Sequence, residues 1–364
     1  MSWKGKVLAY LTVLFNFLLF FSYLAYLSDP ERTVWIAFTG LIYPILLLIN
    51  AVFCLIWFLK RKLFFLPTLL LIIAGMYHHS RYFQLNPLAE HKLESGTSIK
   101  VMSFNVRLFD LYNWTENNAV KQKIIDLIKE QNPDIVCFQE YYYEKSNDFI
   151  TRELIIKELE LPFYHESFSD ESKNNSYFGL ATFSKFPIIN KENLQFSNDN
   201  SNQCIWSDIV INSDTLRFFN THLGSIRFNH SDYNIIGGKG SPLWSHQKIP
   251  KQDIFNRLKK GFTKRSQQIK QILPLIENSP YKKVVCSDLN DTPLSHAYHA
   301  MDKHLKDAFT YSGFGIGGTY IGYIPGLRID YIWHDKKLSS FNYKTYNNEL
   351  SDHKAISVDL VFGN

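Results

Sequence analysis

Hydrophobic and polar positions divide this chain into an apolar first part and a mixed remainder. Residues 7–27 and 34–59 are long apolar runs without a charged side chain, and a shorter run covers residues 63–76. A helix rises about 1.5 Å per residue, so about 20 apolar residues cross a hydrocarbon core of about 30 Å. The pattern predicts an all-α transmembrane segment of about three helices in residues 1–80, of which the third is the shortest.

Basic residues next to these runs predict how the segment is oriented. Lys4 and Lys6 precede the first run, and residues 60–62 (Lys-Arg-Lys) follow the second. The positive-inside rule places both groups in the cytoplasm, so three crossings put the remainder on the non-cytoplasmic side of a plasma (inner) membrane. Two crossings would reverse that side. A cleaved signal peptide is the alternative for the first run, but its apolar part is longer than the usual ~7–15 residues.

Residues 81–98 are largely polar and lack periodicity, which predicts a linker. Beyond it, short apolar runs alternate with stretches of helical spacing, which predicts a separate domain over residues 99–364. The strand candidates are 99–104, 134–138, 178–183, 203–211, 215–223, 284–286, 329–333 and 355–360, and the helix candidates are 119–129, 149–161 and 265–273, the last closed by Pro274. Many strands with a few helices between them predict an α/β fold, with two sheets face to face and helices outside.

Charge and cysteine content narrow the class of protein. The net charge is +5, but the first 97 residues hold eight basic and four acidic residues, which leaves 31 basic and 30 acidic in the rest. A nearly neutral domain lacks the positive surface of a dedicated nucleic-acid binder. Four cysteines in a chain of 364 residues do not form a disulfide scaffold, and their apolar surroundings predict buried thiols.

Polar residues follow several of the predicted strands in a characteristic order. The motifs are Phe-Asn-Val at Asn105, Gln-Glu at Glu140, Thr-His-Leu at His222, Ser-Asp-Leu-Asn-Asp-Thr-Pro at Asp288 and Asn290, Arg-Ile-Asp-Tyr-Ile at Asp330, and Ser-Asp-His at Asp352 and His353. Each motif alone is weak, because Asp-x-Asn-Asp is also an ordinary turn. Together and in this order they resemble the endonuclease/exonuclease/phosphatase superfamily, over roughly residues 99–362.

That superfamily includes deoxyribonuclease I-like nucleases, neutral sphingomyelinases, inositol polyphosphate 5-phosphatases and tyrosyl-DNA phosphodiesterases. The resemblance implies a four-layer α/β/β/α sandwich with its active site at one edge of the paired sheets. It also implies hydrolysis of a phosphate ester, a reaction so slow without catalysis that several stabilising effects must act together.

The resemblance assigns a role to each polar residue. Glu140 is expected to be the main ligand of Mg²⁺ or Mn²⁺, with Asn105 beside it and Asp352 contributing; hard oxygen donors suit both ions. Asp288 is expected to orient or deprotonate the attacking water, and Asn290 to contact the phosphoryl group or that water. His353, held by Asp330, is expected to bind the phosphate, and His222 to bind phosphate or protonate the leaving group.

Each assignment has a structural alternative. Asn105 could cap a turn, Glu140 could end a strand in solvent, and Asp352 could belong to a turn. His222 could be a hydrogen-bonded structural histidine, and Asp330 could pair with Arg328 instead of His353.

The sequence differs from the abasic-site endonuclease branch, because residues 141–143 are three tyrosines and Thr-His-Leu stands in place of that branch's motif. The Thr-His-Leu form is closer to the sphingomyelinases and tyrosyl-DNA phosphodiesterases. The prediction is a membrane-tethered phosphodiesterase, with a nuclease acting on DNA or RNA, or a non-catalytic phosphate- or lipid-binding module, as alternatives. The expected substrate is a phospholipid head group, a nucleic acid or a small phosphate.

Residues 239–270 carry nine basic side chains and one acid, Asp253, with apolar residues at near-helical spacing. An amphipathic basic helix can lie on anionic lipid, which makes membrane lipid an expected partner. The alternative is a solvated helix packed on the domain. No protein partner is predicted.

Overall fold

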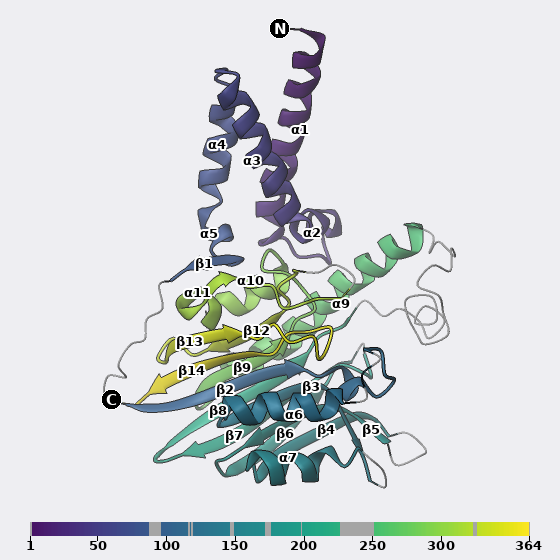
Figure 1. The fold of residues 1–364 in the computed structure, drawn as a ribbon, viewed down its shortest axis with the longest axis vertical. Coiled ribbons are helices and arrows are strands. Elements are labelled where there is room, and N and C mark those ends of the chain that lie inside the picture. The colour runs from purple at the N-terminus through teal and green to yellow at the C-terminus, as the bar shows by residue number, and fades with distance from the viewer. Residues whose placement is uncertain are drawn as a thin grey trace.

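The structure is a computed structural model of the whole chain, and it describes residues 2–363 except 87–95, 116, 118, 146–148, 172–175, 198, 226–250 and 323–325. Its helices are α1 (Trp3–Ala25), α2 (Val34–Leu41), α3 (Tyr43–Leu59), α4 (Phe65–Ala74), α5 (Met76–His79), α6 (Val120–Gln131), α7 (Thr151–Leu159), α9 (Lys251–Glu277), α10 (His296–Asp302) and α11 (Ala308–Ser312). Helices α1–α5, which we call the helical segment, form a column that stands on one side of the sheets (Figure 1).

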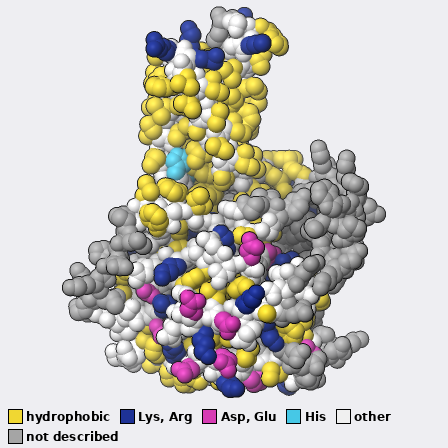
Figure 2. Space-filling model, viewed as in Figure 1, with side chains coloured by type: hydrophobic (Ala, Val, Ile, Leu, Met, Phe, Trp, Pro, Cys, Tyr) yellow, Lys and Arg dark blue, Asp and Glu magenta, His cyan; other side chains and the backbone are white. Residues whose placement is uncertain are grey.

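The surface of this column is mainly apolar, and Lys and Arg side chains gather at its far end (Figure 2). One helix, α1, is long and apolar enough to cross a membrane, and α2 with α3 is a second candidate if this pair, bent by 64°, counts as one span. Among the described residues the structure therefore offers one or two candidate spans, where the sequence predicted about three. The third apolar run forms only the short helix α4, because the helix breaks at Gly75 before α5.

In the described part of the remainder, most strands form two sheets of six strands each. The first has the order β10 (Lys306–Asp307), β12 (Asp330–His334), β9 (Lys282–Asp288), β8 (Asp214–His222), β7 (Gln203–Ile211) and β6 (Ile188–Gln195). The second has the order β13 (Ser339–Thr345), β14 (Ile356–Phe362), β2 (Thr97–Asn105), β3 (Ile135–Glu144), β5 (Ser176–Ser184) and β4 (Phe163–Glu171).

Three apolar cores separate four layers. Between the sheets lie residues such as Val101 of β2 and Val284 of β9. Helices α6 and α7 cover the outer face of the second sheet, and α9 and α10 cover the outer face of the first. The predicted four-layer α/β/β/α sandwich is confirmed.

Two of the predicted elements have wrong boundaries. Strand β3 does not end at Glu140 but continues to Glu144, because residues 141–144 pair with β5 beyond a bulge. Helix α9 begins at Lys251 rather than Arg265 and continues through Pro274 to Glu277, since a proline in the last turn removes only one amide donor.

The basic stretch 239–270 lies on α9 from residue 251 onward, and residues 239–250 are outside the described part. Several of its cations pair with acids of the rest of the chain: Lys264 with Asp199, Arg265 with Asp291, and Lys270 with Asp29 and Glu31. For these residues the packed alternative is the one that the structure supports.

Of the cysteines, residues 137, 204 and 286 are buried free thiols as predicted, whereas Cys54 is only partly buried.

The predicted linker contains a short strand, β1 (Phe83–Leu85), which pairs with β11 (Phe314–Ile316). The helical segment also contacts the sandwich directly. Tyr26 donates a hydrogen bond of 2.6 Å to Asp302 of α10, and the buried guanidinium of Arg81 forms a 2.7 Å ion pair with the same carboxylate.

Candidate active site

The candidate site lies where β8, β9 and β12 of one sheet meet β2 and β3 of the other. Strands β8 and β9 run parallel and place His222 opposite Asp288, while antiparallel β12 places Asp330 opposite the same Asp288. Strand β2 ends at Asn105, opposite Gln139 of β3. Parallel strands end at the same edge of a sheet, so motifs far apart in the sequence converge here.

Asp288 has a side chain that is completely buried. Its carboxylate accepts hydrogen bonds from Asn105 Nδ2 at 2.9 Å and from the backbone N–H of Asn290 at 2.8 Å. Burial raises the pKa of the Asp288 carboxyl above its ordinary value, and the charges of His353 and His222 offset only part of this effect.

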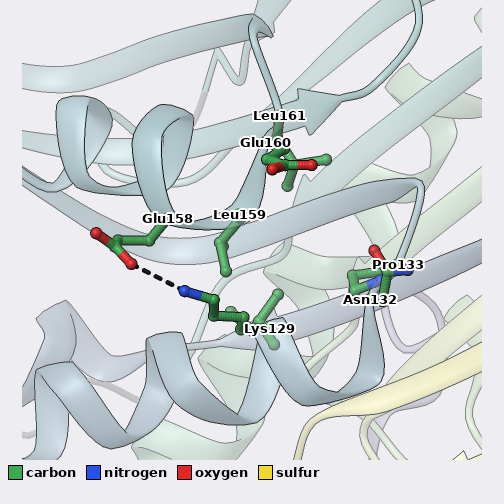
Figure 3. A pocket seen from close by; sticks show the side chains of 8 residues that line it. Lys129, Asn132, Pro133, Glu158, Leu159, Glu160 and Leu161 are labelled. Atoms are coloured by element: carbon green, nitrogen blue, oxygen red, sulfur yellow. Dashed lines mark hydrogen bonds and ion pairs between the residues drawn. The ribbon is translucent and has the colours of Figure 1, made fainter.

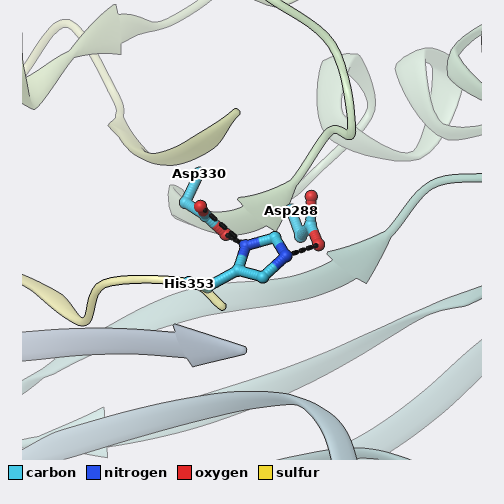
Figure 4. Close-up of side chains that lie close together, drawn as sticks. All are labelled: Asp288, Asp330 and His353. Carbon is cyan, nitrogen blue, oxygen red and sulfur yellow. Dashed lines mark hydrogen bonds and ion pairs between the residues drawn. The ribbon is translucent and has the colours of Figure 1, made fainter. Parts of the chain in front are cut away.

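His353 lies between two carboxylates (Figure 4). Its Nδ1 is 3.0 Å and 3.1 Å from the two carboxylate oxygens of Asp330, and its Nε2 is 3.8 Å from Asp288 Oδ2, too far for a hydrogen bond. Burial alone would lower the pKa of His353, but the charges of Asp330 and Asp288 outweigh burial and raise it well above 6.5. Arg328 pairs with Asp307, so the alternative partner for Asp330 is excluded.

His222 faces Asp288 and Glu140. Its Nε2 lies 3.5 Å from Asp288 Oδ2 and 3.9 Å from Glu140 Oε1, and this buried nitrogen has no hydrogen-bond partner. Buried polar atoms are nearly always hydrogen-bonded in native proteins, so an unpaired one between two carboxylates marks a place for a bound group.

The local backbone turns Glu140 toward this space. Glu140 has φ of +49°, and the register of β3 against β5 shifts between Phe138 and Tyr141. A bulge of this kind redirects a side chain, and left-handed backbone costs roughly 1–2 kcal/mol for a residue with a Cβ. The carboxylate that results is 34% exposed, the most accessible acid of the set.

The two asparagines have structural partners. Asn105 Oδ1 accepts from the backbone N–H of Arg107, so its amide already bridges this residue and Asp288. Asn290 Nδ2 donates to the carbonyl of Leu223 at 2.9 Å and so ties the end of β8 to the end of β9. Each NH2 group has a second N–H, so Asn290 can still donate to a phosphoryl oxygen and accept from the attacking water, the two contacts predicted from the sequence.

Asp352 and Arg107 form the outer rim of the site. The carboxylate of Asp352 lies 3.6 Å from Arg107 Nε, and the Arg107 guanidinium lies 4.3 Å from the centre of the Trp114 ring. Sequence reasoning missed Arg107, whose left-handed φ of +44° gives no local sequence signal apart from its position two residues after Asn105.

Two places in this site offer ligands for a divalent ion. Asp288, Asp330 and His353 bring ligand atoms within 4.8 Å of one another and form a possible acidic metal site. However, Asp330 already engages His353 Nδ1, and a protonated imidazole cannot bind a metal. The accessible Glu140 carboxylate fits a hard, partly hydrated ion better.

A shallow cavity of about 200 Å³ elsewhere is not part of this site. It lies between α6 and α7 on the outer layer, and Lys129 and Glu158 form a 3.0 Å ion pair within its lining (Figure 3). None of the candidate catalytic residues lines it.

Solved structures share this fold. An endonuclease/exonuclease/phosphatase family protein from Bacteroides thetaiotaomicron superposes with a TM-score of 0.53 at 17% identity, over 74% of this chain and 100% of that one. The human Nocturnin catalytic domain superposes with a TM-score of 0.51 at 18% identity, over 74% of this chain and 97% of that one. An endonuclease/exonuclease/phosphatase from Beutenbergia cavernae superposes with a TM-score of 0.51 at 16% identity, over 73% of this chain and 72% of that one. At these identities the likeness concerns the fold alone.

Comparison with family models covers both parts of the chain. Residues 5–82 match a domain of unknown function, and no curated protein matches the chain significantly. Residues 102–353 match the model of the Endonuclease/Exonuclease/phosphatase family. The chain therefore belongs to the endonuclease/exonuclease/phosphatase family, whose members are metal-dependent hydrolases that act on phosphoester bonds.

Proposed function

We propose that this chain is a membrane-tethered, Mg²⁺-dependent phosphodiesterase that hydrolyses its substrate by attack of water. The observation that supports it most is the convergence of two histidines on one buried carboxylate: Asp288 Oδ2 lies 3.5 Å from His222 Nε2 and 3.8 Å from His353 Nε2. Phosphoryl transfer depends mainly on positioning and on stabilising charge, and this set supplies a base with two imidazole groups beside it.

In this proposal Asp288 takes a proton from the attacking water. The hydrogen bonds from Asn105 and from the backbone of Asn290 fix the carboxylate, and burial raises its pKa toward the range in which it accepts protons. General base assistance of this kind contributes roughly 10²–10⁴-fold.

The histidines act on the phosphate. Asp330 holds His353 at Nδ1 and favours its protonated form, so Nε2 donates to a phosphoryl oxygen and opposes the charge that develops there. The unpaired Nε2 of His222 donates to the phosphate or protonates the leaving oxygen.

The metal would be held chiefly by Glu140. Asp352, which contacts Arg107, and the Asn105 oxygen, which has a second lone pair, are the further ligands expected. A bound Mg²⁺ neutralises negative charge on the phosphoryl group.

The helical segment suggests where the substrate lies. In Figure 1 the N-terminus of α1 and the turn between α3 and α4 reach the far end of the column, and these two segments carry Lys4, Lys6 and residues 60–62. By the positive-inside rule that end is cytoplasmic, which places the sandwich at the opposite, non-cytoplasmic surface. A phospholipid head group is then the nearest abundant phosphodiester.

A nuclease is the second candidate. The half-buried Trp114 under the Arg107 guanidinium is the observation that favours it, because aromatic and guanidinium planes stack on unpaired bases. The nearly neutral charge of residues 98–364 disfavours it.

The test uses the full chain in detergent or nanodiscs with bis(p-nitrophenyl) phosphate, sphingomyelin, phosphoinositides, DNA and RNA, each with Mg²⁺, Mn²⁺ or EDTA. We expect turnover that EDTA abolishes and that His353→Ala removes while circular dichroism stays unchanged. Inactivity on every substrate would favour the non-catalytic binding module, and wild-type rates in His353→Ala would refute the site. Reporter fusions at residue 364 would determine the membrane side.

A further inference from the structure

The loop that follows Asp288 is seated in the helical segment. Leu294 is 1% exposed and packs in one apolar core with Leu19 of α1 and Tyr43 of α3. At Gly40 of α2, an added Cβ would lie 2.6 Å from the Leu294 carbonyl oxygen, so helix and loop touch backbone to backbone. Since six residues span at most about 20 Å, the Asp288 backbone lies within that distance of the helical segment.

Helix α9 makes a second connection to the same loop. The buried guanidinium of Arg265 lies 3.0 Å from Asp291 and also donates to the carbonyl of Gly224 at 3.1 Å. One side chain thus holds the segments that follow β9 and β8. The next residue, Ser266, donates at 2.7 Å to Asp29, which lies between α1 and α2. Helix α9 therefore joins both catalytic strand ends to the helical segment.

A different contact anchors His353 and Asp330. Where the chain leaves the helical segment, the carbonyl of Tyr82 accepts from the backbone N–H of Gly317 at 3.0 Å, and β1 pairs with β11. Two residues further along the chain, Thr319 makes two hydrogen bonds. Its side-chain oxygen accepts one from the backbone N–H of Asp330 at 3.1 Å, and its carbonyl oxygen accepts one from the backbone N–H of Lys354 at 2.7 Å. The loop that begins at Gly317 thus supports both members of the His353–Asp330 pair.

We propose that the helical segment is a positioning element of the active site, because it seats the two loops that set the separation of Asp288 and His353. This inference rests on the proposed function. The two side chains are 3.8 Å apart. Asp288 is followed by the loop that enters the helical segment at Leu294, whereas His353 is supported by the loop whose Gly317 is bonded to Tyr82. A displacement of about 1 Å can cost about 10²-fold in rate, so the packing of α1, α2 and α3 sets the turnover of the distant sandwich.

The experiment measures kcat and KM of the full chain in phosphatidylcholine nanodiscs with bis(p-nitrophenyl) phosphate and saturating Mg²⁺. Leu294→Ala is expected to lower kcat by about 10²-fold with little change in KM, and Leu294→Met, which conserves volume, to restore most of it. Leu161→Ala is the matched control, because Leu161 is fully buried in the separate core under α6 and α7. Its kcat per folded molecule should remain that of the wild type.

A second variant leaves the loop sequence intact. Leu19→Ala should lower kcat at least about tenfold, and its effect should not add to that of Leu294→Ala, since both remove one contact. It also serves as the test if Leu294→Ala does not fold. Wild-type kcat in Leu19→Ala, or an equal loss in Leu161→Ala, would overturn the inference while wild-type activity upholds the proposed function. An inactive wild type would refute the proposed function itself.

Discussion

Replacing Asp330 by Asn removes one charge from the site and conserves the size of the side chain. Both carboxylate oxygens lie within 3.1 Å of His353 Nδ1, and the side chain is only 4% exposed. Hydrogen bonds to charged groups contribute about 1.5–3 kcal/mol and neutral ones about 0.5–1.5 kcal/mol. The substitution therefore weakens the interaction that stabilises the protonated His353 ring by about 1–2 kcal/mol. If that energy stabilises the transition state, kcat falls about 5- to 30-fold.

The assay is hydrolysis of bis(p-nitrophenyl) phosphate by the full chain over a range of Mg²⁺ concentrations. Because Asp330 holds a histidine and not the ion, the Mg²⁺ concentration for half-maximal rate should not change. Asp208→Asn is the control, since Asp208 is equally buried in a pair with Arg217 away from the site, and its kcat should remain that of the wild type. Unchanged kcat in Asp330→Asn would refute the pairing argument. A much higher Mg²⁺ requirement would place the ion at Asp330.

Three further predictions concern the metal, pH and packing. Glu140→Gln should raise the Mg²⁺ concentration for half-maximal rate more than about tenfold, because it removes the accessible charge; an unchanged titration would contradict this. Burial lowers the pKa of His165 and of His334 to about 4, against about 6.5 in the unfolded chain. The unfolded state then binds more protons between these values, so the free energy of unfolding should fall by about 3 kcal/mol per histidine as pH falls from about 6.5 to 4. The urea midpoint should fall with it. The double replacement by Gln should flatten that dependence. Gly179→Ala should destabilise the fold by about 1–3 kcal/mol in urea unfolding, because its Cβ would lie 2.0 Å from the Ser167 carbonyl oxygen; a wild-type midpoint would refute this.

The sequence predicted the convergence of the polar motifs because the relevant signals are local. An apolar strand followed by a polar residue places that residue at a sheet edge, and the order of motifs supplied the family and hence the pairing of sheets. The family resemblance implied the pairing of Asp330 with His353, but not the strand registers that place Asp330 and His222 opposite Asp288, which no local pattern contains.

The features that the sequence did not predict depend on tertiary contacts, which the identity of a single residue does not reveal. Glu140 was expected to end a strand, because a left-handed bulge looks like a strand end in the hydrophobic pattern. Pro274 was expected to end a helix that tertiary packing extends by another turn. No pattern in the sequence singles out Leu294, and only the folded chain shows it inside a core built from α1 and α3.

The central claim is that Asp288 and His353 act as one catalytic unit on a phosphoester, with a divalent ion. Single-turnover rates of the full chain, of Asp288→Asn, of His353→Ala and of the double variant test it most directly, each with Mg²⁺ and with EDTA. Residues that act together are not additive, so each single variant should lose about 10³-fold or more and the double variant scarcely more than either one. Wild-type rates in Asp288→Asn, or a double variant whose loss is the product of the two single losses, would contradict the account.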